Sequence, residues 1–342
     1  MTSSPETGQF VTYSILSNGS AIPDTVEIVS IKTSSVLNQV PSATIRIAGS
    51  DPGGVSVVNG AQFAPGAEIE IRLGYDHTVA PVFRGLVGTL RLTSSAETGP
   101  VIEVECFHKA IRLIENRINR VFEGRSDQSI LTTIISDRGL EATVGPTEGI
   151  VDALVQEDMS DWDLLTARAA VNSLFVNCQP DGSVKIEAID LKAATRARLT
   201  YGDNIFDLSV ETSALDQVKK LNIHTADGAV ITAAAAPSSG WGNLSAATLA
   251  DVLDAHQDVV AAPDGVWRAS SKQVQAMMLL SQSLAATIGE IITQGASLYE
   301  PGAMVEIDGV GSRFDGSAMI SGVHHEAEDG HWETSLELGL AP

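Results

Sequence analysis

Cysteine is scarce in this chain of 342 residues, which contains only Cys106 and Cys178. The two do not form a C-x-x-C pair, so the sequence supports neither a zinc ribbon nor a framework of disulfides. Free cysteines without such spacing usually behave as small apolar side chains. We therefore expect both thiols to be buried, and we expect no metal centre built on cysteine.

Basic residues are also few, with 21 lysines and arginines against 43 aspartates and glutamates and a formal net charge of -22. Binding to nucleic acid depends on clustered Lys and Arg that neutralise phosphates, so this balance argues against a nucleic-acid partner. An acidic surface keeps a free chain soluble. It would also suit the wall of a passage that must not retain nucleic acid or acidic cargo.

Long apolar runs are absent. No uninterrupted apolar stretch reaches about 18 residues, the length that a helix needs to cross a bilayer. Residues 1–10 (MTSSPETGQF) have neither a basic region nor an apolar region of the kind found in secretory signals. We therefore expect no insertion into a membrane and a protein that is cytosolic when made.

The first third of the chain contains several segments in which apolar and polar residues alternate. This period of two, bounded by Gly, Pro, Asn and Asp, indicates half-buried strands of a meander or a barrel. The segments are residues 26–31, 43–47, 68–73, 85–90 and 101–106.

Helical spacing follows. Ser126 or Asp127 precedes an apolar stripe and Gly139 stands just past its end, and Ser160 with Asp163 forms a capping-box pattern before a second helix. Two more helices are expected at residues 245–256 and 271–289. Strands are expected between and after them, at residues 174–178, 183–188, 206–210, 218–225, 303–307, 318–323 and 332–338.

These patterns predict a mostly β fold (β+α) with two related β-barrel-like domains and helical insertions. The length of the chain exceeds what one hydrophobic core usually supports. The predicted division is a first barrel domain at residues 1–120, a helical connector at 121–172, a second barrel domain at 173–232 and 296–342, and a loop with a helical insertion at 233–295.

A repeat links the two ends of the chain. Residues 64–71 (APGAEIEI) and 300–307 (EPGAMVEI) share Pro-Gly-Ala and an ending of a β-branched residue, Glu and Ile. Gly88 and Gly322 then lie 22 and 20 residues after the glycines of these turns, each in a strand-like segment that an alternating strand follows. Three copies of a duplicated chain would present six similar units, matching a sixfold partner on one side and a threefold partner on the other.

Several segments in order resemble one family, the baseplate hubs of contractile injection systems, which comprises the N-terminal region of VgrG and the phage late control protein D family. The resemblance runs from about residue 82 to residue 338. The segments are 82–88 (VFRGLVG), 113–124 (LIENRINRVFEG), 155–170 (VQEDMSDWDLLTARAA), 322–324 (GVH) and 330–338 (GHWETSLEL).

This resemblance implies a structural protein and not an enzyme: a homotrimer that forms a pseudo-hexameric ring and adapts the sixfold inner tube to the threefold spike. The implied partners are the inner tube protein, the central spike protein and other baseplate proteins, and the implied location is an injection particle or virion tail. VgrG chains typically continue into a spike, whereas this sequence ends at Pro342. We therefore expect the spike to be a separate chain or a removed C-terminal region.

The sequence contains one weak candidate for a metal-binding site. His324, His325 and His331 lie within eight positions together with three carboxylates, and all of these are possible ligands. Neighbouring His324 and His325 are expected to point to opposite faces of a strand, and the Asp329-Gly330 pair marks a hairpin. We therefore expect solvated turn residues, with no metal and no cofactor.

Asp158, Asp161 and Asp163 suggest an alternative, a cell-wall or polysaccharide hydrolase within an injector, because paired carboxylates cleave glycosidic bonds. Acidic residues at a helix N-terminus also stabilise the helix dipole, which accounts for them without catalysis. A carbohydrate-binding or adhesive module is a further alternative, but the four tryptophans are scattered and form no platform. Trp241, in a Gly-rich loop, is the candidate for contact with a partner.

Overall fold

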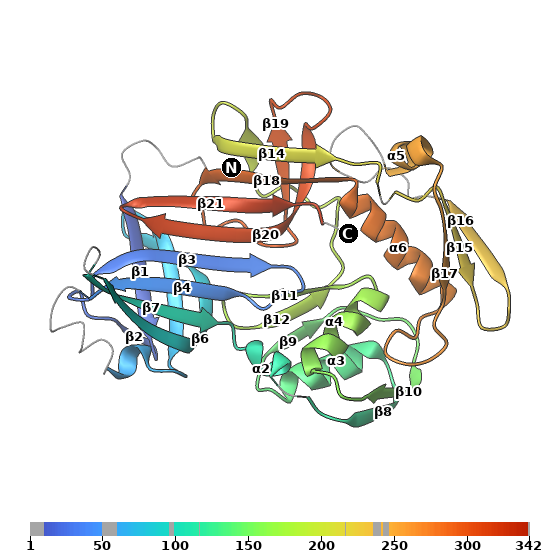
Figure 1. Ribbon diagram of the computed structural model, residues 1–342, viewed down its shortest axis with the longest axis horizontal. Helices are drawn as coiled ribbons and strands as arrows, with labels where there is room; N and C mark the ends of the chain where they lie inside the picture. Colours follow the sequence, from blue (N-terminus) through green and yellow to red (C-terminus); the bar gives the residue numbers. More distant parts are fainter. Residues whose placement is uncertain are drawn as a thin grey trace.

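The computed structural model describes residues 10–49, 60–95, 99–115, 117–215, 217–234, 241 and 246–340. Strands dominate these residues, which confirms the prediction of a mostly β chain. Thirteen of the strands join one large, largely antiparallel sheet that contains segments from both ends of the chain (Figure 1).

The N-terminal half of this sheet has the order β3-β4-β7-β6-β5-β1-β2. Its alternating apolar residues, among them Ile45, Ile69 and Val104, are buried in one core, as their period of two predicts. A short 3-10 helix, η1 (Ala61–Phe63), packs Phe63 into the same core. The strands are β1 (Val11–Ser17), β2 (Ser20–Ala21), β3 (Ile28–Val36), β4 (Ser42–Ala48), β5 (Glu68–Tyr75), β6 (Thr78–Ser95) and β7 (Gly99–Phe107).

The C-terminal half has the order β14-β18-β21-β20, and β20 also pairs with β19, which pairs with β13. A second core that includes Ile291, Val305 and Leu336 lies beneath it. The strands are β13 (Arg198–Thr200), β14 (Ile205–Thr212), β18 (Thr287–Gln294), β19 (Met304–Asp308), β20 (Gly316–Glu328) and β21 (His331–Leu338).

The two halves are joined by antiparallel pairing of β20 with β3, from Gly322 opposite Val36 to Glu328 opposite Ser30. Trp332 of the C-terminal half also packs into the core of the N-terminal half. The described pairings run as one open path from β14 to β2. Closure of each half into a barrel therefore stays a prediction.

The repeat seen in the sequence is present in the backbone. Gly66 donates its N–H to the carbonyl of Val87 at 2.8 Å, and Gly302 donates to the carbonyl of Ile320 at 2.7 Å. Both glycines have positive φ, +90° and +85°, which a side chain would strain. The strand orders also correspond, since β3-β4-β7-β6-β5 matches β14-β18-β21-β20-β19.

Bulges in these strands set the correspondence residue by residue. In β6 the extra residue is Gly88, and in β20 it is Ser321, so the expected match of Gly88 with Gly322 is wrong by one position. The bulge position requires glycine in one half and not in the other for a steric reason. A Cβ on Gly88 would lie 2.7 Å from the ring of Phe107. In the other half Gly339 occupies the position of Phe107, which leaves room for the side chain of Ser321. Strands β3 and β14 carry matching irregularities as well, between Ile28 and Ser30 and between Ile205 and Asp207.

The middle of the chain forms a separate core of helices and short strands. Ser126 caps α3, and Ser160 with Asp163 forms the predicted capping box of α4. The connector predicted at 121–172 contains the two expected helices and also three short strands, and the hairpin that follows packs into the same core. The elements are α2 (Ile111–Ile114), β8 (Arg120–Arg125), α3 (Asp127–Ser136), β9 (Ala142–Val144), β10 (Val151–Gln156), α4 (Asp161–Val171), β11 (Phe175–Cys178) and β12 (Val184–Glu187).

A small three-stranded sheet and the helix α6 (Ser271–Ala285) form the remaining unit. The helix expected at 271–289 ends earlier, because the β-branched run that begins at Thr287 forms β18 of the large sheet. The predicted boundary at residue 295 moves accordingly. Among the described residues, no helix has the length and apolar character required to span a membrane. The other elements are β15 (Lys220–His224), β16 (Val230–Ala234), α5 (Ala246–Leu253) and β17 (His256–Val260).

Candidate functional site

One face of the large sheet is exposed to solvent, and acidic side chains dominate it. The strand registers place alternate residues of β14, β18, β21, β20, β3, β4, β7 and β6 on this face. We call it the acidic face. Its acidic residues are Glu103, Glu105, Asp207, Glu211, Glu290, Glu326, Glu328, Glu333 and Glu337, against the basic residues Lys32, Arg46 and Arg91.

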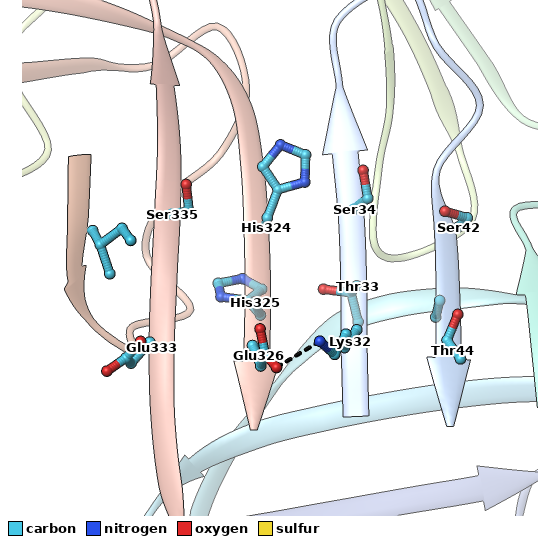
Figure 2. Close-up of a pocket in the computed structure, with 12 residues that line it drawn as sticks. Lys32, Thr33, Ser34, Ser42, Thr44, His324, His325, Glu326, Glu333 and Ser335 are labelled. Carbon is cyan, nitrogen blue, oxygen red and sulfur yellow. Dashed lines mark ion pairs between the residues drawn. The ribbon is translucent and has the colours of Figure 1, made fainter. Parts of the chain in front are cut away.

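The centre of the acidic face spans the junction of the two halves of the sheet (Figure 2). Lys32 of β3 forms an ion pair with Glu326 of β20 at 2.6 Å. His324 lies 2.8 Å from Glu337, between the ring Nε2 and a carboxylate oxygen. The side chains border a shallow hollow of about 300 Å³. Lys32 and Arg91 are already paired with carboxylates of this face, so it presents a negative surface that would repel nucleic acid and acidic polymers.

The structure does not bring the three candidate histidines together. His324 and His325 point to opposite faces of β20, as the strand period predicts, so only His324 belongs to the acidic face. His331 begins β21, four ladder positions from Ser335, the partner of His324, which corresponds to about 13 Å along the strand. Within the described ranges, no three His, Cys, Asp or Glu side chains are grouped as a metal site.

His325 lies on the buried face of β20, with its side chain 5% exposed and opposite Thr33 of β3. Its Nδ1 is 2.8 Å from the hydroxyl of Thr334, and its ring meets Trp332 edge-on with 5.5 Å between the centroids. Burial lowers the pKa of His325 to about 3, because the charged imidazolium would lose its hydration, and repulsion by His324 adds to this effect. The imidazole is therefore neutral at physiological pH and acts as a packing residue at the junction.

This environment predicts a pH dependence of stability. In the unfolded chain His325 has an ordinary pKa near 6.5. Below that pH the unfolded state therefore binds a proton that the folded state excludes. The free energy of unfolding then falls by up to about 1.4 kcal/mol for each unit by which the pH is lowered. The contribution is complete above about pH 6.5 and is lost progressively as the pH falls from there toward the folded-state pKa of about 3. His108, whose pKa burial lowers to about 4, adds to the same slope. Urea denaturation across this range should show a shallower slope for His325→Gln than for His331→Gln, the matched control at an exposed position. Equal slopes for the two variants would contradict this assignment.

Of the three acidic residues near α4, Asp158 and Asp163 are exposed, whereas Asp161 is buried. Asp161 is completely buried and accepts hydrogen bonds from Arg120 at 2.6 Å, from Arg138 at 2.6 and 2.8 Å, and from Gln156 at 3.0 Å. Asp163 accepts from the backbone N–H of Ser160 in the capping box. Asp161 therefore connects α4 to β8, β10 and the end of α3, a structural role that its residue type alone did not reveal.

Trp241, the candidate for contact with a partner, is buried. Its indole is only 4% exposed, and its Nε1–H donates to the carbonyl of Phe314. The ring fills the space above Gly289 in β18, where a Cβ would lie 3.0 Å from it. The loop therefore does not expose this indole, because the interior of the C-terminal half offers it both apolar packing and an acceptor, and its contact with a partner stays a prediction. Most of the surrounding loop, residues 235–240 and 242–245, lies outside the described residues.

The cysteines follow the prediction. Cys106 and Cys178 are both free and buried. Burial raises the pKa of Cys106 to about 12, because the thiolate would be desolvated. Neither thiol is therefore activated for nucleophilic chemistry.

The acidic face itself was missed as a site by the sequence reasoning. The available signal was the repeated Glu at alternate positions, as in Glu103 and Glu105 or Glu333 and Glu337. Alternation alone shows that such residues share one face of a strand, and it does not show which strands are neighbours. The face becomes visible only once β20 is seen to pair with β3.

Comparison with known sequences gives one family. The family model Alg8_N, described as the Alg8 N-terminal domain, matches residues 7–329. No curated protein matches the sequence.

Comparison with solved structures gives phage tail and type VI secretion proteins. The 43 kDa tail protein of prophage MuSo2 from Shewanella oneidensis has a TM-score of 0.72 at 13% identity, over 97% of this chain and 98% of that one. A tail protein from Neisseria meningitidis also has a TM-score of 0.72, at 15% identity over 97% of both chains. The E. coli c3393 protein, described as a component of the type VI secretion system, has 0.60 at 10% identity, over 96% of this chain and 79% of that one. At these identities the likeness shows that the fold is shared.

Proposed function

The chain belongs to the Alg8 N-terminal domain family, and we propose that it is a structural tail or baseplate component of a contractile injection machine. The fold it shares with tail proteins and a type VI secretion component, over nearly the whole chain, supports this role. The proposed role requires no catalysis. Asp161, one of the three aspartates of the hydrolase alternative, is buried and paired with Arg120 and Arg138, which supports a structural role for this residue.

More specifically, we propose that three copies form the hub that adapts a sixfold inner tube to a threefold spike. The observation that carries this proposal is the internal duplication, in which matching strand orders and bulges give each chain two similar units. A trimer then presents six units to the tube and keeps threefold symmetry for the spike. The inner tube protein, the spike protein and other baseplate proteins are its proposed partners, in an injection particle or a virion tail.

We assign the acidic face to the wall of the passage through this ring. It is a broad polar surface that crosses both halves of the sheet without interruption. A wall of this charge would not retain nucleic acid or acidic cargo, because like charges repel.

The stoichiometry is tested by light scattering on the purified chain, alone and mixed with the tube and spike proteins of the same machine. We expect the mass of three copies of the 35.9 kDa chain, either alone or once the partners are present. A chain that stays monomeric with both partners present would contradict the hub role.

A further inference from the structure

Strands β6 and β14 of the large sheet each have an edge without a partner within the described part of the chain. Residues 89–94 of β6 pair only with β7, and residues 206–212 of β14 pair only with β18. The two edges lie on opposite sides of the sheet (Figure 1). Leu92, in the β6 edge, is 55% exposed although it lies on the side of the sheet that carries the core. An edge of this kind exposes unpaired N–H and C=O groups and is a template for another strand.

The duplication indicates what covers these edges. In the correspondence set by the bulges, β20 is the counterpart of β6, and β3 is the counterpart of β14. Inside the chain, β20 and β3 pair with each other. The N-terminal half therefore uses β3 at the internal junction and leaves open β6, the counterpart of β20. The C-terminal half uses β20 at the junction and leaves open β14, the counterpart of β3.

We propose that β6 of one copy pairs antiparallel with β14 of a second copy, in the register that β20 and β3 already use within the chain. This inference rests on the proposed trimeric hub and specifies the contact that builds it. Transfer of the internal register gives the pairs Leu90 with Thr212, Arg91 with Glu211, Leu92 with Val210, Thr93 with Ser209, and Ser94 with Leu208.

The side chains brought together by this register are complementary. Arg91 lies opposite Glu211 on the acidic face, where the internal junction has its own ion pair, Lys32 with Glu326. Within its own chain Arg91 donates to Glu103 at 2.8 Å, and its guanidinium has five N–H groups, so donors remain for Glu211. On the other face Leu92 meets Val210, an apolar cross-strand pair.

The exposure of corresponding residues supports the same pairing. His325 corresponds to Leu92 and is 5% exposed because β3 covers it, whereas Leu92 is 55% exposed. A second copy of β14 would cover Leu92 in the way that β3 covers His325.

Closure into a ring follows from the placement of the two edges. Because the contact joins different surfaces of the two copies, it is head-to-tail. Head-to-tail contacts close into a ring when the rotation from one copy to the next is a whole fraction of a full turn. In a ring of three copies, internal β20–β3 junctions would alternate with β6–β14 junctions of the same type. All six units would then belong to one continuous belt of strands, in which the β6 and β14 edges are both covered.

Disulfide trapping tests the register. Directly opposite Cα atoms in an antiparallel pair lie about 4.5–5.5 Å apart, within the range of about 4.4–6.8 Å that a disulfide spans. The full chain carrying Leu92→Cys and Val210→Cys, oxidised and run on a denaturing gel without reductant, should give a covalent trimer as its largest and main species. Thr93→Cys with Ser209→Cys, two exposed positions that folding tolerates, should give the same result.

The matched control is Leu92→Cys with Glu211→Cys, which is out of register by one residue and places the thiols on opposite faces. It should stay uncrosslinked. Cross-linking of the control as efficiently as the test pairs, or species larger than a trimer, would overturn the proposed register. Absence of cross-links in both test pairs, while light scattering reports a trimer, would show that the hub forms through another surface. Absence of any trimer with tube and spike present would instead remove the hub role itself.

Discussion

Asp161→Ala should lower the free energy of unfolding by about 3 kcal/mol, because it leaves Arg120 and Arg138 facing each other without their shared carboxylate. We place the loss at the lower end of the range for buried ion pairs, since both arginine side chains are partly exposed. Guanidinium denaturation followed by circular dichroism measures it.

Asp163→Ala is the matched control, because it removes a neighbouring carboxylate that only caps the helix, at a cost of about 1 kcal/mol. The same pair of variants separates a structural role from a catalytic one. If the wild-type protein degraded peptidoglycan, and Asp161→Ala abolished that activity without a loss of stability, Asp161 would be a catalytic residue and the hydrolase alternative would stand.

Trp241→Ala should destabilise the C-terminal half by about 3–5 kcal/mol, the usual effect of removing a buried aromatic side chain. The change opens a cavity above Gly289 and leaves the carbonyl of Phe314 without its donor. A lower midpoint of thermal or chemical unfolding is the expected result.

Trp267→Ala serves as the control, since this indole is 57% exposed and its loss should change the free energy of unfolding by less than about 0.5 kcal/mol. The two variants also distinguish packing from partner contact. If Trp241→Ala kept full stability but failed to join its partners, Trp241 would be a contact residue after all.

Local features of the fold were predictable because they depend on neighbouring residues. Alternation located the strands of the N-terminal half, and Ser126 and Ser160 marked the starts of α3 and α4. The end of α6 was misplaced because no Gly or Pro separates it from β18. There the β-branched residues from Thr287 onward follow the pairing of the sheet and not the helix.

Pairing between distant segments was not predictable, because it is set by tertiary contacts. The repeat indicated two related units, but nothing in the sequence showed that β20 would bind β3, almost 300 residues earlier in the chain. The acidic face and the two open edges depend on that pairing, so the sequence could not reveal them. Burial also placed Trp241 in a core and assigned Asp161 to structure, since residue type does not determine exposure.

Electron microscopy of the assembled machine tests the hub role most directly. We predict a ring of three copies between the end of the inner tube and the spike, with strands of β6 and β14 adjacent at each boundary between copies and the acidic face lining the passage. Particles that lack the chain at this junction, or that contain it in another number or place, would contradict the hub role.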